Sequence, residues 1–326
     1  MSDSASRIIS RISNRVLWRV CCVMFGLSSV ASAAEPMPTY SDVTYGPDAK
    51  QKLHVWKVES AQPTPALLFI HGGGWVAGNR ESNLNEVLPE MLAAGISVIS
   101  MEYRFIDQAI DAGIKPPVKW PLEDAKRALQ FVRSRATEWN LDKQRIAASG
   151  VSAGACSSLW LALHAEMSEP QSDDPIARES TRLWCAAVSG AQTSLDPAEL
   201  KAWTPNSRYG GHAFGFYPNP KDLKTRDTQF AEFLAAREKV LPWIQEYSPY
   251  QHAGAGDPPI YLWYTAAPEL GQPQKDPTHT ANMGVKLQEK LRAAGCECEL
   301  VYPGAPEIRH ATRAAFLIAQ LKKPAP

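Results

Sequence analysis

Short apolar runs alternate with longer amphipathic segments along most of the chain. Six of the runs have the continuous hydrophobicity of strands buried on both faces: residues 66–70, 96–101, 146–149, 184–189, 260–264 and 299–302. Two weaker strands, near 43–45 and 53–58, are separated by turn-forming residues and predict a hairpin. Helices are expected between the strands: 84–94, 121–139, from 153 to about 164, 282–294, and a last one ending near 321. This alternation predicts an α/β fold with a mostly parallel central sheet and helices on both faces.

One segment, residues 190–259, breaks the pattern. Aromatic residues, Gly and Pro dominate it, and only 232–241 has a helical pattern. We interpret it as an insertion or lid within a single domain over 34–326, because loops this long are usually functional. Its aromatic side chains either line an acyl or aryl pocket or pack in a core: Trp203, Tyr209, Phe214, Phe216 and Tyr217.

The first 33 residues have the layout of a secretory signal peptide. Four arginines precede an apolar run over residues 20–30, which the small residues Ala31-Ser32-Ala33 follow. We expect cleavage after Ala33, export to the periplasm or the outside of the cell, and no stable membrane insertion afterwards. A retained membrane anchor is the alternative, although the run is short for a bilayer span. A start at Met24 would remove the signal.

Charge and cysteine content give no support for several classes of partner and cofactor. The chain has 34 basic and 34 acidic residues, and removal of residues 1–33 would leave 30 and 33. This balance gives no support for nucleic acid or an anionic membrane as a partner. Four of the six cysteines follow residue 33: Cys156, Cys185, Cys296 and Cys298. Their spacing fits no zinc or redox motif, and Cys156 and Cys185 are expected to be buried as small apolar side chains.

The sequence Gly150-Val151-Ser152-Ala153-Gly154 joins a strand of small residues to a helix. This pattern predicts a nucleophile elbow, a sharp turn that lifts the hydroxyl of Ser152 above the sheet. Gly150 and Gly154 are expected where a side chain would strike the neighbouring strand or helix. A serine hydroxyl attacks a carbonyl only when a base takes its proton, so the elbow requires a histidine and a carboxylate.

A second motif, His71-Gly72-Gly73-Gly74, directly follows the buried run at 66–70. Glycines let backbone N–H groups approach a developing oxyanion without side-chain clashes, and the N–H of Ala153 offers a further donor. A phosphate-binding loop is the alternative. It is disfavoured because the Gly-Lys-Ser/Thr ending of such loops is missing.

Five histidines follow Ser152: His164, His212, His252, His279 and His310. His310 comes just after the last predicted strand, where a loop can bring it over the elbow, so we predict that His310 is the base. His164 lies about three helical turns beyond the serine, and His212 and His252 fall in the insertion.

The acid is expected on the loop after residues 260–264. Asp276 is the first candidate and Glu269 the second. Either carboxylate is otherwise a solvated loop charge. His279, three residues beyond Asp276, is interpreted as a surface side chain or as a partner of the acid.

The motifs together resemble α/β-hydrolase esterases, most closely the hormone-sensitive-lipase and feruloyl-esterase-like branches. The matching residues occur in the family's order from about residue 45 to the C-terminus, apart from 190–259: His71-Gly72-Gly73-Gly74-Trp75, Glu102-Tyr103-Arg104, Pro121-Leu122-Glu123-Asp124-Ala125 and the elbow. The resemblance implies a triad of Ser152, Asp276 and His310, with Gly73, Gly74 and Ala153 as oxyanion donors. It also implies that Arg104 and Asp124 tie loops together near the site. The family's Asp-x-x-Val-Pro pattern is missing from the acid loop, so the identity of the acid stays open.

These features predict an exported, carboxylesterase- or lipase-like serine hydrolase that forms an acyl-enzyme on Ser152. No metal or organic cofactor is implied, and the expected substrates are small-molecule or polysaccharide-linked esters. Two alternatives are a peptidase or amidase of the same fold and a hydrolase-fold binding protein without turnover. The chain has no room for the propeller domain of oligopeptidase relatives, which disfavours the peptidase. The sequence names neither the substrate nor the oligomeric state.

Overall fold

The computed structural model describes residues 36–216 and 225–324, so the predicted signal peptide and Tyr217 lie outside the described residues. Within the described residues, no helix is long and apolar enough to cross a membrane.

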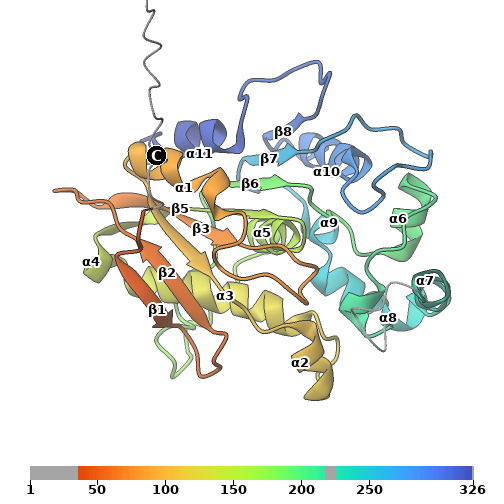
Figure 1. Cartoon of the computed structure of the whole chain (residues 1–326), viewed down its shortest axis with the longest axis horizontal. Helices are drawn as coiled ribbons and strands as arrows, with labels where there is room; N and C mark the ends of the chain where they lie inside the picture. The colour runs from red at the N-terminus through yellow and green to blue at the C-terminus, as the bar shows by residue number, and fades with distance from the viewer. Residues whose placement is uncertain (1–35, 217–224, 325–326) are drawn as a thin grey trace, which may run out of the picture. The chain divides into compact units, whose positions relative to one another are not determined.

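A single eight-stranded sheet forms the centre of the described domain (Figure 1). The spatial order is β1-β2-β4-β3-β5-β6-β7-β8. The strands are β1 (Tyr40–Thr44), β2 (Lys52–Trp56), β3 (Thr64–Ile70), β4 (Ser97–Met101), β5 (Leu141–Val151), β6 (Ala186–Ser189), β7 (Ile260–Trp263) and β8 (Cys298–Val301). β1 and β2 are antiparallel to their neighbours, and the other six strands run parallel. The predicted strands and the mostly parallel sheet are confirmed.

Alternate residues of the strands pack against helices on opposite faces, as the pleat of a strand requires. Leu67 and Phe69 of β3 share one apolar cluster with α1 (Leu88–Ala93) and α11 (Arg313–Leu321). Leu68 and Ile70 share the other with α3 (Lys119–Ser134), α5 (Ala153–Leu163) and α10 (Ala281–Ala293). Figure 1 shows α1 and α11 on one side of the sheet and α3 on the other. Both faces are therefore covered.

The segment 190–259 is mainly helical where the structure describes it. It contains α6 (Pro197–Trp203), the short 3₁₀ helix η2 (Gly211–Phe214), α7 (Arg226–Ala235), α8 (Arg237–Tyr247) and α9 (Pro249–His252). The helical structure expected over 232–241 is confirmed except at Ala236, where the backbone breaks between α7 and α8. Arg237, just after the break, forms a bidentate ion pair with the buried Asp196 at the start of α6.

The remaining short helices lie in connections: η1 (Leu84–Glu86), α2 (Ile106–Asp111) and α4 (Ala136–Trp139). The one helix predicted over 121–139 is divided into α3 and α4, because the backbone breaks at Arg135. Arg104, which follows β4, forms an ion pair of 2.6 Å with the buried Asp124 of α3. This contact fits the loop-tying role that the resemblance implies for both residues.

Candidate active site

Ser152 lies between the last residue of β5 and the first residue of α5. Its backbone has a φ of +54° and a ψ of −120°, which is strained for a residue with a side chain. The backbone N–H of Ser152 donates to the carbonyl of Ser189 at 3.0 Å, and the carbonyl of Ser152 accepts from the N–H of Cys156 at 2.9 Å. These bonds hold the sharp turn that the sequence predicts.

The two glycines of the elbow are needed because backbone passes close to both. A Cβ on Gly154 would lie 2.0 Å from the carbonyl oxygen of Ile70 and 2.4 Å from that of His71. A Cβ on Gly150 would lie 2.5 Å from the backbone of Gly154. The expectation that side chains at these positions would strike their neighbours is confirmed.

The glycine loop after β3 packs directly against the elbow. A Cβ on Gly72 would lie 3.4 Å from the Cβ of Ser152. Gly73 and Gly74 have φ values of +105° and +61° and are at least partly accessible. Among the described residues, the backbone N–H groups of Gly73 and Ala153 have no hydrogen-bond acceptor, and the backbone of Gly74 forms a hydrogen bond with His212. Two backbone donors beside the serine, those of Gly73 and Ala153, therefore lack a protein acceptor, as an oxyanion hole requires.

Buried polar contacts hold this glycine loop in place from behind. The His71 ring contacts Glu102 at 3.1 Å and stacks on Tyr103, whose hydroxyl donates to the carbonyls of His71 and Gly72. Burial acts to raise the pKa of Glu102, but the contact with His71 and the charge of Lys50 outweigh it and lower the pKa. Glu102 therefore stays ionised as an acceptor for the ring.

Trp75 and His212 extend the support of the loop toward α5 and the insertion. The Trp75 indole N–H donates to the hydroxyl of Ser157 in α5 at 3.0 Å. His212 lies against Trp75 with ring centroids 5.9 Å apart. Burial lowers the pKa of His212 to about 3, so its ring is neutral there. His212 thus contributes packing behind the loop.

His279 is the histidine that lies next to Ser152. Its Nε2 is 2.9 Å from the Oγ of Ser152, and its Nδ1 is 2.8 Å from Oδ2 of Asp276. Both residues of this pair lie on the loop between β7 and α10. With Nδ1–H donating to Asp276, Nε2 is left to accept the hydroxyl proton of Ser152. The three side chains form a continuous Ser–His–Asp relay.

The expected position of His310 over the elbow is therefore wrong. The Nδ1 of His310 lies 2.7 Å from Oε2 of Glu299 in β8, and its backbone N–H donates to the same carboxylate. The carbonyl of His310 accepts from the hydroxyl of Tyr261. Glu299 is buried and faces the loop after β8, so it holds His310 at this edge of the sheet.

The same contacts show which of the two candidate acids, Asp276 or Glu269, lies next to His279. Asp276 accepts from the ring of His279 and, through Oδ1, from the backbone N–H groups of Thr278 and His279. Partial burial acts to raise the pKa of Asp276, but these hydrogen bonds and the charge of His279 outweigh it and lower the pKa. The carboxylate of Glu269 is exposed and contacts Gln274 at 3.5 Å. Asp276 is therefore the carboxylate that orients His279.

Sequence reasoning did not assign His279 to the serine, although a local signal was present. His279 is the third residue after Asp276, and Asp276 forms an Asx turn that brings its carboxylate back to the His279 ring. Such a pair needs no tertiary contact to assemble. The sequence shows the pair but not its distance from Ser152.

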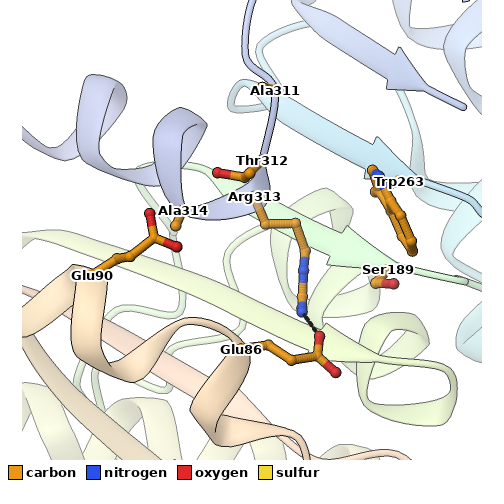
Figure 2. A pocket seen from close by; sticks show the side chains of 8 residues that line it. All are labelled: Glu86, Glu90, Ser189, Trp263, Ala311, Thr312, Arg313 and Ala314. Atoms are coloured by element: carbon orange, nitrogen blue, oxygen red, sulfur yellow. Dashed lines mark hydrogen bonds and ion pairs between the residues drawn. The ribbon is translucent and has the colours of Figure 1, made fainter. Parts of the chain in front are cut away.

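Two adjoining hollows lie at the ends of β6 and β7, and one of them borders His279 and Asp276. One, of about 200 Å³, is lined in part by Asp276, His279 and Gly190. The other, of about 280 Å³, reaches the start of α11 and includes Glu90 and Thr312. Figure 2 shows the second hollow, with the Trp263 ring facing the ion pair of Arg313 and Glu86 across it and Ser189 nearby. Ser189 and Trp263 line both hollows, so together they leave room beside His279.

Some aromatic side chains of the segment 190–259 pack against other rings, and some also line a separate hollow. Tyr209 is buried against Trp75, and Trp203 packs edge-on against Tyr250. Phe214 and Phe216 pack on Phe233 and also line a hollow of about 310 Å³ between α2, η2 and α8.

The described residues contain neither a metal-binding cluster nor a disulfide. In residues 36–216 and 225–324, no three His, Cys, Asp or Glu side chains come close enough together to hold a metal ion. Cys156, Cys185, Cys296 and Cys298 are free thiols. Cys156 and Cys185 are buried, as expected, and burial raises the pKa of both thiols.

A parallel sheet with a serine elbow after β5, a glycine loop after β3 and a His–Asp pair after β7 defines an α/β-hydrolase. Similarity to solved structures agrees with this fold. An acetyl ester-xyloside bifunctional hydrolase from Caldicellulosiruptor lactoaceticus superposes with a TM-score of 0.59 at 22% identity, covering 85% of this chain and 90% of that one.

The chain belongs to the BD-FAE family, which matches residues 55–274. The suspected esterase branch of the α/β-hydrolases is thereby confirmed, and the match ends just before Asp276. Two curated relatives are esterases of Mycobacterium tuberculosis. LipQ is 28% identical to this chain, and the match covers 83% of this chain and 56% of LipQ. LipC is 32% identical, and the match covers 41% of this chain and 32% of LipC. The chain thus spans between a third and just over half of the length of these relatives.

Proposed function

We propose that this protein is a serine carboxylic-ester hydrolase in which Ser152 is the nucleophile, His279 the base and Asp276 the orienting acid. The observation that carries the proposal is the unbroken relay from the Ser152 hydroxyl through both ring nitrogens of His279 to Asp276. The esterase names of its relatives support the same class of reaction.

The chemistry follows from the positions of these atoms. Ser152 Oγ attacks the ester carbonyl carbon while Nε2 of His279 takes the hydroxyl proton. The N–H groups of Gly73 and Ala153 bind the oxyanion. The bond from carbon to the leaving oxygen then breaks, and His279 returns the proton to the departing alcohol. A water molecule then attacks the acyl carbon while Nε2 of His279 takes its proton. The bond from the acyl carbon to Oγ of Ser152 breaks, His279 returns the proton to Oγ, and the acid is released.

The leaving alcohol belongs on the His279 side of the serine, because His279 must protonate its oxygen. The two hollows that share Ser189 and Trp263 provide room on that side. An indole wall with nearby hydroxyl and carboxylate groups suits a hydroxylated ring. A polysaccharide-linked ester is therefore our proposed substrate class, and the named activity of the Caldicellulosiruptor hydrolase supports it.

The test compares the purified chain with its Ser152→Ala variant on p-nitrophenyl acetate, acetylated xylan and a p-nitroanilide. We expect ester hydrolysis by the wild type and a loss in kcat on the order of 10⁶-fold in the variant, because the nucleophile is gone. Hydrolysis of the anilide alone would indicate an amidase. A folded wild type inactive on every substrate would indicate a binding protein and contradict the proposal. Activity on p-nitrophenyl acetate without activity on xylan would refute only the substrate class.

We also propose that the protein is exported and that residues 1–33 are its signal. The arginine-led apolar run and the Ala31-Ser32-Ala33 site support this. Mass spectrometry of the chain from a fractionated bacterial host is expected to find it outside the cytoplasm, beginning at Ala34. An intact N-terminus on a cytoplasmic product would contradict export.

A further inference from the structure

Gln192 lies just after β6, and its side chain joins two backbone positions that adjoin His279. The Nε2 of Gln192 donates to the carbonyl oxygen of Thr278 at 2.8 Å and to that of Gly190 at 3.2 Å. The residue is fully buried. These contacts are independent of the Ser152–His279–Asp276 relay itself.

Both carbonyls belong to residues that adjoin His279. Thr278 is the residue before His279, so its peptide group leads into the backbone of the histidine. Gly190 lies under the ring, and a Cβ there would be 3.3 Å from Cδ2 and 3.4 Å from Cβ of His279. By holding both carbonyls, Gln192 fixes the His279 loop against the end of β6.

The same strand end is bonded to the nucleophile. Ser189, the last residue of β6, accepts the backbone N–H of Ser152 at 3.0 Å. Three residues after Ser189, Gln192 reaches across to Thr278. A short path of backbone and one amide therefore connects the serine to the loop that carries its base.

The other long-range anchors of the loop lie at Gly271, bonded to Trp203, and at Gln274, bonded to Asn206, and the residues next to His279 rely on Gln192. The side chains of His279 and Asp276 are 37% and 58% exposed, and Asp276 bonds mainly within the loop. Among the described residues, Oε1 of Gln192 is buried and meets no hydrogen-bond donor. An unpaired buried oxygen costs free energy. The two donations from Nε2 to the backbone beside His279 offset this cost.

We propose that Gln192 is a positioning residue for His279: its amide holds the ring nitrogen at hydrogen-bond distance from Ser152. The role rests on the proposed function, since it concerns the base of that reaction. It acts through backbone carbonyls and touches no substrate atom.

Gln192→Met removes the donor at nearly constant side-chain length, and Gln130→Met is its matched control. Gln130 is also buried, and its Nε2 also donates to two carbonyls, those of Ala177 at 2.9 Å and Glu179 at 2.8 Å, away from the relay. Both variants should have a lower Tm than the wild type. Measured well below either Tm, Gln192→Met is expected to lower kcat on p-nitrophenyl acetate about 10²-fold with KM nearly unchanged, since a small misplacement of a catalytic group has that effect. Gln130→Met should keep the wild-type kcat.

The rate of Ser152 labelling by a fluorophosphonate gives a second measurement, which should fall in Gln192→Met alone. An active wild type whose Gln192→Met variant keeps its kcat and labelling rate, or loses no more than Gln130→Met, overturns the positioning role and leaves the esterase proposal standing. A folded wild type that neither hydrolyses esters nor takes up the label overturns both.

Discussion

Replacing His279 with Ala is expected to lower kcat on an activated ester by about 10⁴-fold or more, whereas His310→Ala should leave kcat nearly unchanged. The reason is that the Nε2 of His279 contacts Ser152, whereas His310 is bonded to Glu299. Without a base, the hydroxyl of Ser152 must lose its proton to water, and residual catalysis comes from the oxyanion donors alone.

His310→Ala is an informative control because we expect it to lower the stability of the protein and not its kcat. The buried Glu299 carboxylate would lose its ring donor, at a cost of about 1–3 kcal/mol in the free energy of unfolding. Burial acts to raise the pKa of Glu299, but hydrogen bonds from His310 and from two backbone N–H groups outweigh it and lower the pKa. A lowered folded-state pKa means that the stability gain is present above the ordinary carboxyl range and is lost as the pH falls through the lowered value. Urea unfolding at neutral and acidic pH, beside steady-state kinetics, would measure both effects. A large loss of kcat in His310→Ala with full activity in His279→Ala would contradict the assignment.

Asp276→Asn is the second large expected effect, a loss of kcat of around 10⁴-fold. The amide can still accept the backbone N–H groups of Thr278 and His279 through its oxygen, so the turn should remain. Its NH₂ group would instead donate to Nδ1 of His279, which places the ring proton on Nε2 and leaves Ser152 without an acceptor.

Glu269→Gln is the control for Asp276→Asn. Both changes remove one carboxylate from the same loop, but Glu269 is exposed and has no contact with His279 among the described residues. Steady-state kinetics on p-nitrophenyl acetate should show wild-type kcat for Glu269→Gln. Equal losses in the two variants would mean that loop charge, and not the orientation of His279, determines the rate.

The parts of the molecule that could be predicted are those that local patterns determine. Continuous apolar runs located the strands, and the spacing of Gly150, Ser152 and Gly154 located the elbow because steric limits there are severe. The break between α7 and α8 could not be predicted in this way. Arg237 beside that break pairs with Asp196, far along the chain, and no local periodicity records such a contact.

The sequence does not show which histidine lies next to Ser152, because the two loops that carry His279 and His310 both follow strands at the same edge of the sheet. The choice between them depends on which loop a distant partner holds. Glu299, an acidic residue in a short buried strand, holds His310, and Gln192 holds the loop of His279. A buried carboxylate in the last strand was a sign that a nearby cation or donor would be drawn to it.

The most direct test of the account is the rate at which a fluorophosphonate labels Ser152 in four chains: wild type, Ser152→Ala, His279→Ala and His310→Ala. We expect one adduct per wild-type chain, located on Ser152 by peptide mass spectrometry, and none in Ser152→Ala. Labelling should be much slower in His279→Ala and close to the wild-type rate in His310→Ala. Fast labelling that survives the loss of His279 but is abolished by the loss of His310 would contradict it.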